Sequence, residues 1–186
     1  KATGEFLIFM NAGDQFLNEK VLSKCLPYFL QEIDVISGIG YLSGQKWIPA
    51  KASDLSVAFF LKRSLNHQAT FINRKLFQDN LYRTDLKIVG DSVFFFQALI
   101  MDNASYVDIP IEIALCEKPG LSGQEIKAFA DLEVSIKGML PDRMVSDIDF
   151  LINYYNPAVR MIGGWLYKMH FLKKILRFIR TNRKTR

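Results

Sequence analysis

The sequence predicts an α/β domain, for two reasons. Apolar runs of strand length alternate with segments in which apolar residues recur at roughly 3.6 residues, the helical period. Of the 186 residues, 49% are hydrophobic and 13% are aromatic, which is more than a disordered chain carries. We therefore expect a sizeable core, built from a mixed sheet with helices packed on it and a helical extension at the C-terminal end.

The first predicted strand, residues 5–10, is a continuous apolar run that ends in a polar turn at residues 11–14. Because the run has no polar face, we expect a buried, parallel, central strand. The helical period then covers residues 18–32, with Asn18 as the N-cap and Pro27 as the point where the helix kinks or divides.

The remaining elements follow in chain order, with Pro110 between two of the strands. They are a strand at 34–37, a hairpin that turns at 43–45, a helix from the capping Asp54 to residue 64, a strand at 69–72, a short helix at 74–79, an apolar helix from Asp91 to residue 102, strands at 105–108 and 111–115, and helices at 124–139, 147–155 and 158–180. We predict a main domain over residues 1–125 and a helical extension over residues 126–186.

The net charge of +5 is concentrated at the C-terminal end. Residues 1–149 hold 15 of the 24 basic residues and all 19 acidic ones, whereas residues 150–186 hold the other 9 basic residues and no acid. Residues 165–186 contain an amphipathic basic helix, which predicts either contact with an anionic membrane surface or docking on another part of the protein. The acidic remainder argues against nucleic-acid binding.

Two further features bound the setting of the protein. No uninterrupted apolar run of about 18 residues exists, so no membrane span is predicted. Cys25 and Cys116 lie in apolar surroundings without metal-ligand spacing, so we expect buried, reduced thiols. The chain opens at Lys1 directly before a strand, which suggests a fragment.

The turn after the first strand is a candidate metal or ligand site. Asp14 follows a buried strand, on the rim where open α/β sheets bind ligands, and its carboxylate suits Mg²⁺ or Mn²⁺. Asn11 lies in the same turn and is a candidate substrate contact. The alternative is an Asx turn that only ends the strand.

Two other polar segments precede or open predicted elements. His67 and Gln68 come just before a strand, where they could meet a polyhydroxy ligand or form a structural hydrogen-bonding pair. Asp91 heads the most apolar helix, so it is either an ordinary N-cap or a rigidly held general base. The glycine-containing loop Gly120, Leu121 and Ser122 permits close approach to phosphate, with a plain connecting loop as the alternative.

Taken in order, these segments resemble the second half of bacterial family-2 glycosyltransferases, which have the GT-A, Rossmann-like fold. The resemblance covers roughly residues 1–125 and is carried by Ala2 to Asp14, His67 to Ile72, Asp85 to Phe95, and Gly120 to Ser122. It implies an inverting transfer of a sugar from a nucleotide-sugar donor to an acceptor hydroxyl, in the synthesis of cell-surface polysaccharide or a lipid-linked glycan.

The resemblance also implies roles for single residues. Asp91 falls on the catalytic base and Asp14 on the last acid of the metal-binding turn, so a divalent cation, Mg²⁺ or Mn²⁺, is expected. His67 and Gln68 would border a sugar, and residues 120–122 would belong to a loop that closes over the donor. The expected location is cytoplasmic, peripheral on the inner face of the bacterial membrane.

The sequence departs from the family pattern in two respects. Asn11 and Gly13 stand where many relatives carry acids, so metal affinity would rely on the diphosphate. The nucleotide-binding N-terminal unit of the family is missing upstream of Lys1, so the chain alone is not expected to turn over. The rival interpretation is a non-catalytic interaction or membrane-docking module derived from such a transferase; nucleotidyl transfer on a related sheet is a further alternative.

Overall fold

The computed structural model describes residues 2–78, 80–116 and 125–155. The predicted helix at 158–180, the basic tail at 165–186 and the loop at 120–122 lie outside these residues. The chain divides into two compact units, Lys1–Met139 and Leu140–Arg186, and the helix α4 (Glu125–Lys137) therefore belongs to the first of them. Each unit is described by itself.

The first unit is α/β, as predicted, and is built on a mixed sheet of six strands. The sheet order is β1-β5-β3-β6-β2, with β4 paired to β3. The parallel pair is β3 with β6, and the other described pairs are antiparallel. The strands are β1 (Phe6–Leu7), β2 (Gln15–Phe16), β3 (Val35–Leu42), β4 (Gln45–Trp47), β5 (Thr70–Asn73) and β6 (Tyr106–Cys116).

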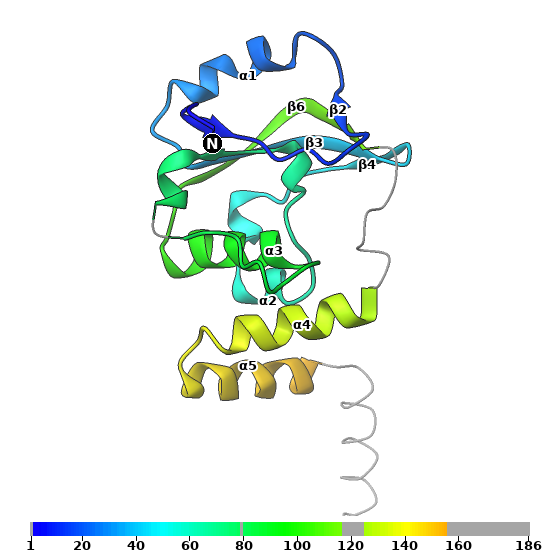
Figure 1. The fold of residues 1–186 in the computed structure, drawn as a ribbon. Coiled ribbons are helices and arrows are strands. Elements are labelled where there is room, and N and C mark those ends of the chain that lie inside the picture. The colour runs from blue at the N-terminus through cyan, green and yellow to red at the C-terminus, as the bar shows by residue number, and fades with distance from the viewer. Residues whose placement is uncertain (1, 79, 117–124, 156–186) are drawn as a thin grey trace, which may run out of the picture. The chain divides into compact units, whose positions relative to one another are not determined.

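Helices cover both faces of this sheet (Figure 1). On one face lies α1 (Val21–Phe29), and on the other lie α2 (Val57–Phe60) and α3 (Gly90–Phe96). A π-helical segment continues α3, and α4 packs beside α3. The remaining elements of this unit are the π-helical segment Gln97–Met101, α4 (Glu125–Lys137) and three 3₁₀ turns, Ala52–Asp54, His67–Ala69 and Arg74–Phe77.

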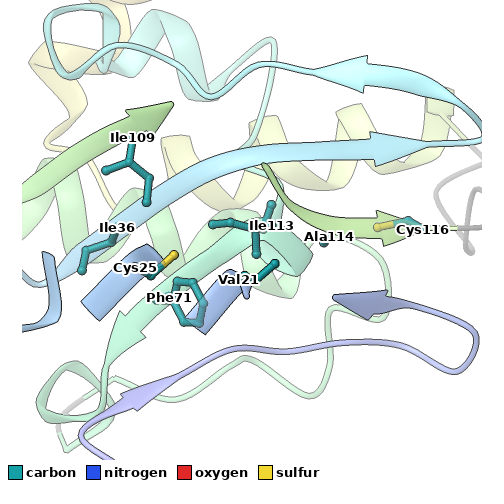
Figure 2. Close-up of a cluster of buried hydrophobic side chains, with 9 residues drawn as sticks. Val21, Cys25, Ile36, Phe71, Ile109, Ile113, Ala114 and Cys116 are labelled. Carbon is teal, nitrogen blue, oxygen red and sulfur yellow. The ribbon is translucent and has the colours of Figure 1, made fainter. Parts of the chain in front are cut away.

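One apolar cluster joins α1 to the sheet (Figure 2). Its buried members come from α1, β3, β5, β6 and the turn before β5: Val21, Cys25, Ile36, Ala69, Phe71, Ile109, Ile113, Ala114 and Cys116. Both thiols are free and buried, as predicted. Burial raises the pKa of Cys25 to about 11, and burial followed by the nearby Asp14 raises the pKa of Cys116 to about 11. Thiols held in this way remain protonated at neutral pH.

A buried carboxylate ties the start of β3 to the start of β6. Asp34 Oδ2 accepts hydrogen bonds from Ser105 N at 3.0 Å and from Ser105 Oγ at 2.9 Å, and Asp34 Oδ1 faces Lys75 Nζ at 2.5 Å. Burial raises the pKa of this carboxyl, but the bonds from Lys75 and Ser105 outweigh it, so the pKa lies below its ordinary value. We call these three residues the acid latch.

The strand expected at residues 5–10 is the largest correction to the predicted fold. Instead of a central parallel strand, β1 is a two-residue edge strand antiparallel to β5. The apolar run is continuous for another reason. Ile8 and Met10 pack against the core cluster, whereas Phe9 packs on aromatic rings of a different segment, so side chains on both sides of the run make apolar contacts.

Two prolines also act differently from prediction. Pro27 lies inside α1 without dividing it, because the helix ends two residues later at Phe29 and leaves little helix for the proline to disrupt. Pro110 lies within the single strand β6, where the ladder with β3 shifts register opposite residues 37 to 40. A bulge of this kind tolerates a residue that has no N–H group.

Other boundaries were closer to the prediction. The hairpin of β3 and β4 is confirmed, and it turns at Ser43 (φ 49°) and Gly44 (φ 79°), the two positive φ values of a type I′ turn. The cap of α2 is Ser56, whose Oγ accepts from Phe59 N, whereas Asp54 ends the preceding 3₁₀ turn. The predicted cap Asn18 is wrong, because the N-cap of α1 is Lys20, which makes no side-chain cap bond; Asn18 Oδ1 accepts from Lys20 N before the helix begins.

The second unit contains α5 (Asp142–Tyr155), which begins five residues before the predicted helix at 147. Pro141 O accepts from Met144 N and Val145 N and so starts the helical ladder. Among the described helices, none combines the length and apolar character that a membrane crossing requires.

Candidate functional site

Three segments that are far apart in sequence meet through polar side chains. They are the turn after β1, the 3₁₀ turn His67–Ala69 and the first turn of α3. His67 Nδ1 lies 2.7 Å from Asp91 Oδ2, and the two side chains are 24% and 19% exposed. The pair is therefore sheltered yet reachable, as a reacting group must be.

Asn11 extends this pair toward the turn after β1. Asn11 Nδ2 lies 3.5 Å from His67 Nε2, and Asn11 N donates to Asp14 Oδ2 at 2.8 Å. We call these four residues, Asp14, Asn11, His67 and Asp91, the polar chain. It brings together four of the predicted site residues, of which the first and the last, Asn11 and Asp91, are 80 positions apart.

The polar chain fixes the tautomer of His67. An ionised carboxylate only accepts hydrogen bonds. The protonated nitrogen of His67 is therefore Nδ1, whose N–H donates a hydrogen bond to Asp91 Oδ2. In a neutral ring Nε2 is then the acceptor, which matches the amide N–H₂ that Asn11 directs at it. His67 is therefore held from both sides, with its donor pointing at Asp91.

Local sequence explains why Asn11 reaches the site. Ile8 and Met10 pack on the core cluster, so the alternating residues Phe9 and Asn11 face the other side of the chain. The turn then closes through Asp14 N, which donates to Asn11 O at 3.0 Å, and Gly13 adopts φ 95°, a conformation that glycine permits.

The turn that carries His67 is held by Asn66. Asn66 Oδ1 accepts from Gln68 N at 3.0 Å, and Asn66 O accepts from Thr70 Oγ1 at 2.7 Å. A Cβ on Gly40 of β3 would lie 2.5 Å from Asn66 Nδ2, so only glycine leaves room for this side chain. Gln68 joins the arrangement through its backbone, next to His67.

Asp91 does not act as the N-cap of α3. The cap position is Val89, which makes no side-chain bond, and Asp91 lies in the first turn with its carboxylate turned to His67. Ser92 Oγ is 3.4 Å from Asp91 Oδ1. The following residues Val93 to Phe96 are all buried, so the helix start is fixed rigidly in the core.

An aromatic group that the sequence analysis did not single out borders the polar chain. Phe9, Phe77, Tyr82 and Phe94 are linked by ring contacts with centroid distances of 4.5 to 5.6 Å. Burial, and then the charge of Asp91, raise the pKa of Tyr82. The sequence contains little that indicates this aromatic group, because Tyr82 lies in an irregular segment and Phe9 is part of the apolar run that predicts a strand.

The described residues do not by themselves form a metal centre. Among them no group of three or more His, Cys, Asp or Glu lies close enough to hold an ion. Asp14 offers one carboxylate, one oxygen of which already accepts from Asn11 N, and the Cys116 thiol beside it remains protonated. A divalent cation here would need most of its ligands from a bound molecule.

A shallow hollow of about 200 Å³ lies elsewhere and does not include the polar chain. It is bordered by Lys24, Lys46 and Glu112, among others. Glu112 already accepts from Tyr41 Oη at 2.5 Å and from Lys46 Nζ at 3.0 Å. Because Lys46 and Glu112 are already paired with each other, we place the candidate site at the polar chain.

Fold and site together define an α/β protein with a His–Asp pair at the start of a buried helix. No model of a known protein family matches the chain, and no curated protein sequence matches it.

Proposed function

We propose that the protein is an inverting glycosyltransferase that moves a sugar from a nucleotide-sugar donor to an acceptor hydroxyl. The observation that supports this most is the polar chain itself. Asp14, Asn11, His67 and Asp91 come from three segments and lie in one hydrogen-bonded arrangement. These are the positions that the resemblance to family-2 glycosyltransferases marks for the metal turn, the sugar and the base.

In this proposal Asp91 is the general base. The acceptor oxygen attacks the anomeric carbon, the bond from that carbon to the diphosphate breaks, and the hydroxyl proton passes to the Asp91 carboxylate. His67 occupies Oδ2 at 2.7 Å, which leaves Oδ1 for the acceptor hydroxyl. Ser92 Oγ, at 3.4 Å from Oδ1, is the nearby group that the hydroxyl would displace.

The turn after β1 would face the leaving group. Asp14 and Asn11 lie on the side of His67 away from Asp91, so donor and acceptor would meet at the imidazole. A divalent cation bound by Asp14 and the phosphates would neutralise the departing diphosphate. Gly120 to Ser122 and the membrane contact of residues 165–186 are part of the proposal on sequence grounds, as are a polysaccharide or lipid-linked acceptor and a cytoplasmic location.

The test is the release of nucleoside diphosphate by the full-length protein. Nucleotide sugars carrying UDP, GDP, dTDP and CDP are supplied singly, with and without Mn²⁺, and the free diphosphate is measured. Asp91→Asn should lower turnover by about 10² to 10⁴-fold with donor affinity little changed. The matched control is Asp102→Asn. Asp102 lies beyond the C-terminal end of the same helix, and its carboxylate accepts hydrogen bonds from Asn80 and Gln97. Normal turnover by Asp91→Asn would refute the proposal.

A second candidate function is a non-catalytic module derived from such a transferase. It is favoured by the turn after β1, where Asn11 and Gly13 replace acids of the family pattern and Asp14 is the remaining carboxylate. This module would bind a nucleotide or a sugar without consuming it. Donor binding in calorimetry, together with no diphosphate release from any of the four nucleotide sugars, would support it.

A further inference from the structure

Phe9 is an exposed aromatic residue next to the polar chain, close to groups that form hydrogen bonds. Phe9 is 36% exposed, and its ring contacts Tyr82 at 4.9 Å and Phe77 at 5.6 Å between centroids. Phe9 lies two residues before Asn11 and, unlike its neighbours Ile8 and Met10, is not part of the core cluster. An aromatic surface therefore adjoins the amide that contacts His67.

Tyr82 provides a hydroxyl with no partner. Its ring is held between Phe9 and Phe94, at 4.9 and 5.0 Å, and its Oη is closed off from solvent without a hydrogen-bond partner among the described residues. A buried hydroxyl left unpaired lowers stability, so such a group in a native protein calls for an explanation. Tyr82 packs on Phe94 of α3, one helical turn after Asp91, so Tyr82 lies at the helix start that carries this carboxylate.

The state of the hydroxyl follows from its surroundings. Burial and the negative charge of Asp91 raise the pKa of Tyr82, so the phenol keeps its proton at neutral pH. Tyr82 therefore keeps a hydroxyl that can donate a hydrogen bond, and its ring packs on the helix whose first turn carries Asp91. A ligand that carries neighbouring hydroxyl groups could use both of them.

We propose that Phe9, Tyr82 and Asp91 form the subsite for a pyranose ring of the acceptor, which rests on the transferase function proposed above. A pyranose has an apolar face of C–H groups, which packs on the negative face of an aromatic ring, and hydroxyls around its edge. Phe9 takes the apolar face, and Tyr82 Oη and Asp91 bind hydroxyls. Phe9 is 36% exposed, so a sugar can reach its ring, and binding then has to open access to the buried Tyr82 Oη.

The test uses saturation-transfer NMR on the full-length protein with simple sugars as probes. The probes are methyl β-D-glucopyranoside, methyl β-D-galactopyranoside and, as an acyclic control, D-glucitol. Protons on one face of at least one pyranoside should receive saturation, whereas D-glucitol should not. Equal saturation of D-glucitol, or none for either pyranoside, would overturn the subsite.

Variants separate this subsite from a purely structural aromatic cluster. Phe9→Leu and Tyr82→Phe should each weaken binding of the pyranoside about 3- to 10-fold. Tyr82→Phe keeps the ring and removes an unpaired hydroxyl, so its melting temperature should stay unchanged or rise. Phe59→Leu is the matched control, because Phe59 packs on Phe60 and Arg63 instead.

The outcomes distinguish this inference from the proposed function. Wild-type affinity in either Phe9→Leu or Tyr82→Phe would overturn the subsite even where Asp91→Asn abolishes transfer. Weakened binding without loss of stability in Tyr82→Phe would support the subsite. Normal turnover by Asp91→Asn would instead refute the transferase function, on which the role of the sugar as acceptor rests.

Discussion

Removal of the Asp34 carboxylate should destabilise the first unit more than removal of an exposed acid. Asp34→Ala leaves Ser105 N and Ser105 Oγ without the acceptor that now lies at 3.0 and 2.9 Å, in a place where the Asp34 side chain is 12% exposed. The Lys75 ammonium lies 2.5 Å from the carboxylate but is 58% exposed, so it rehydrates and contributes little. Asp34→Ala removes two hydrogen bonds to a charged group, and it also relieves the cost of desolvating that charge. We therefore expect the free energy of unfolding to fall by about 2 to 4 kcal/mol.

The effect should depend on pH in a defined direction. The pKa of Asp34 is lowered from 3.8 in the folded protein, so its contribution is complete above about pH 4 and is lost as the pH falls through the folded pKa. The unfolding free energies of wild type and Asp34→Ala should therefore converge in acid. Asp85→Asn is the control, because Asp85 pairs with Arg83 but is 62% exposed.

The assay is urea unfolding followed by circular dichroism, from pH 3 to pH 8. The reasoning would be refuted if Asp34→Ala lost less than about 1 kcal/mol at pH 7, or if its difference from wild type stayed constant down to pH 3. Either result would mean that the contacts of Asp34 with Ser105 and Lys75 do not stabilise the fold.

Two other predictions concern the core and the turn that carries His67. Gly40→Ala should lower the free energy of unfolding by about 1 to 3 kcal/mol and lower turnover, because the new Cβ would lie 2.5 Å from Asn66 Nδ2. Urea unfolding measures the first effect and diphosphate release measures the second. Wild-type values in both assays would contradict this role of Gly40. Cys25 and Cys116 should resist a thiol reagent at pH 8 in the native protein and react after denaturation, because burial raises both pKa values to about 11. Rapid native labelling would contradict that burial.

Sequence reasoning located the polar residues better than the strands around them. Asp14, His67 and Asp91 stand after, before or at the start of apolar elements, and each had an ordinary structural alternative, so it was their order along the chain that singled them out. The neighbourhood of β1 was predicted wrongly, since an apolar run does not reveal whether a second face is covered by helices or by the rings of Phe77 and Tyr82. That covering segment is irregular and has no periodic pattern to read.

Long-range pairing explains the remaining differences. The break expected at Pro110 is a bulge within β6, because the parallel ladder with β3 resumes on the other side of it. The latch of Asp34 joins residues 71 positions apart, and local sequence contains no sign of that contact. The turn at Ser43 and Gly44 was predictable, because a tight hairpin turn needs positive φ values and glycine adopts them readily.

The central claim is that His67 points its donor at Asp91 while Asn11 holds its other nitrogen. The protein has two histidines, so a His170→Gln background leaves a single imidazole to observe. Long-range ¹H–¹⁵N correlation spectra at about pH 9, where an ordinary imidazole is neutral, report which nitrogen carries the proton. We predict a proton on Nδ1, with a signal that shifts in Asp91→Asn. A proton on Nε2, or an Nδ1 signal that Asp91→Asn leaves unchanged, would contradict the account.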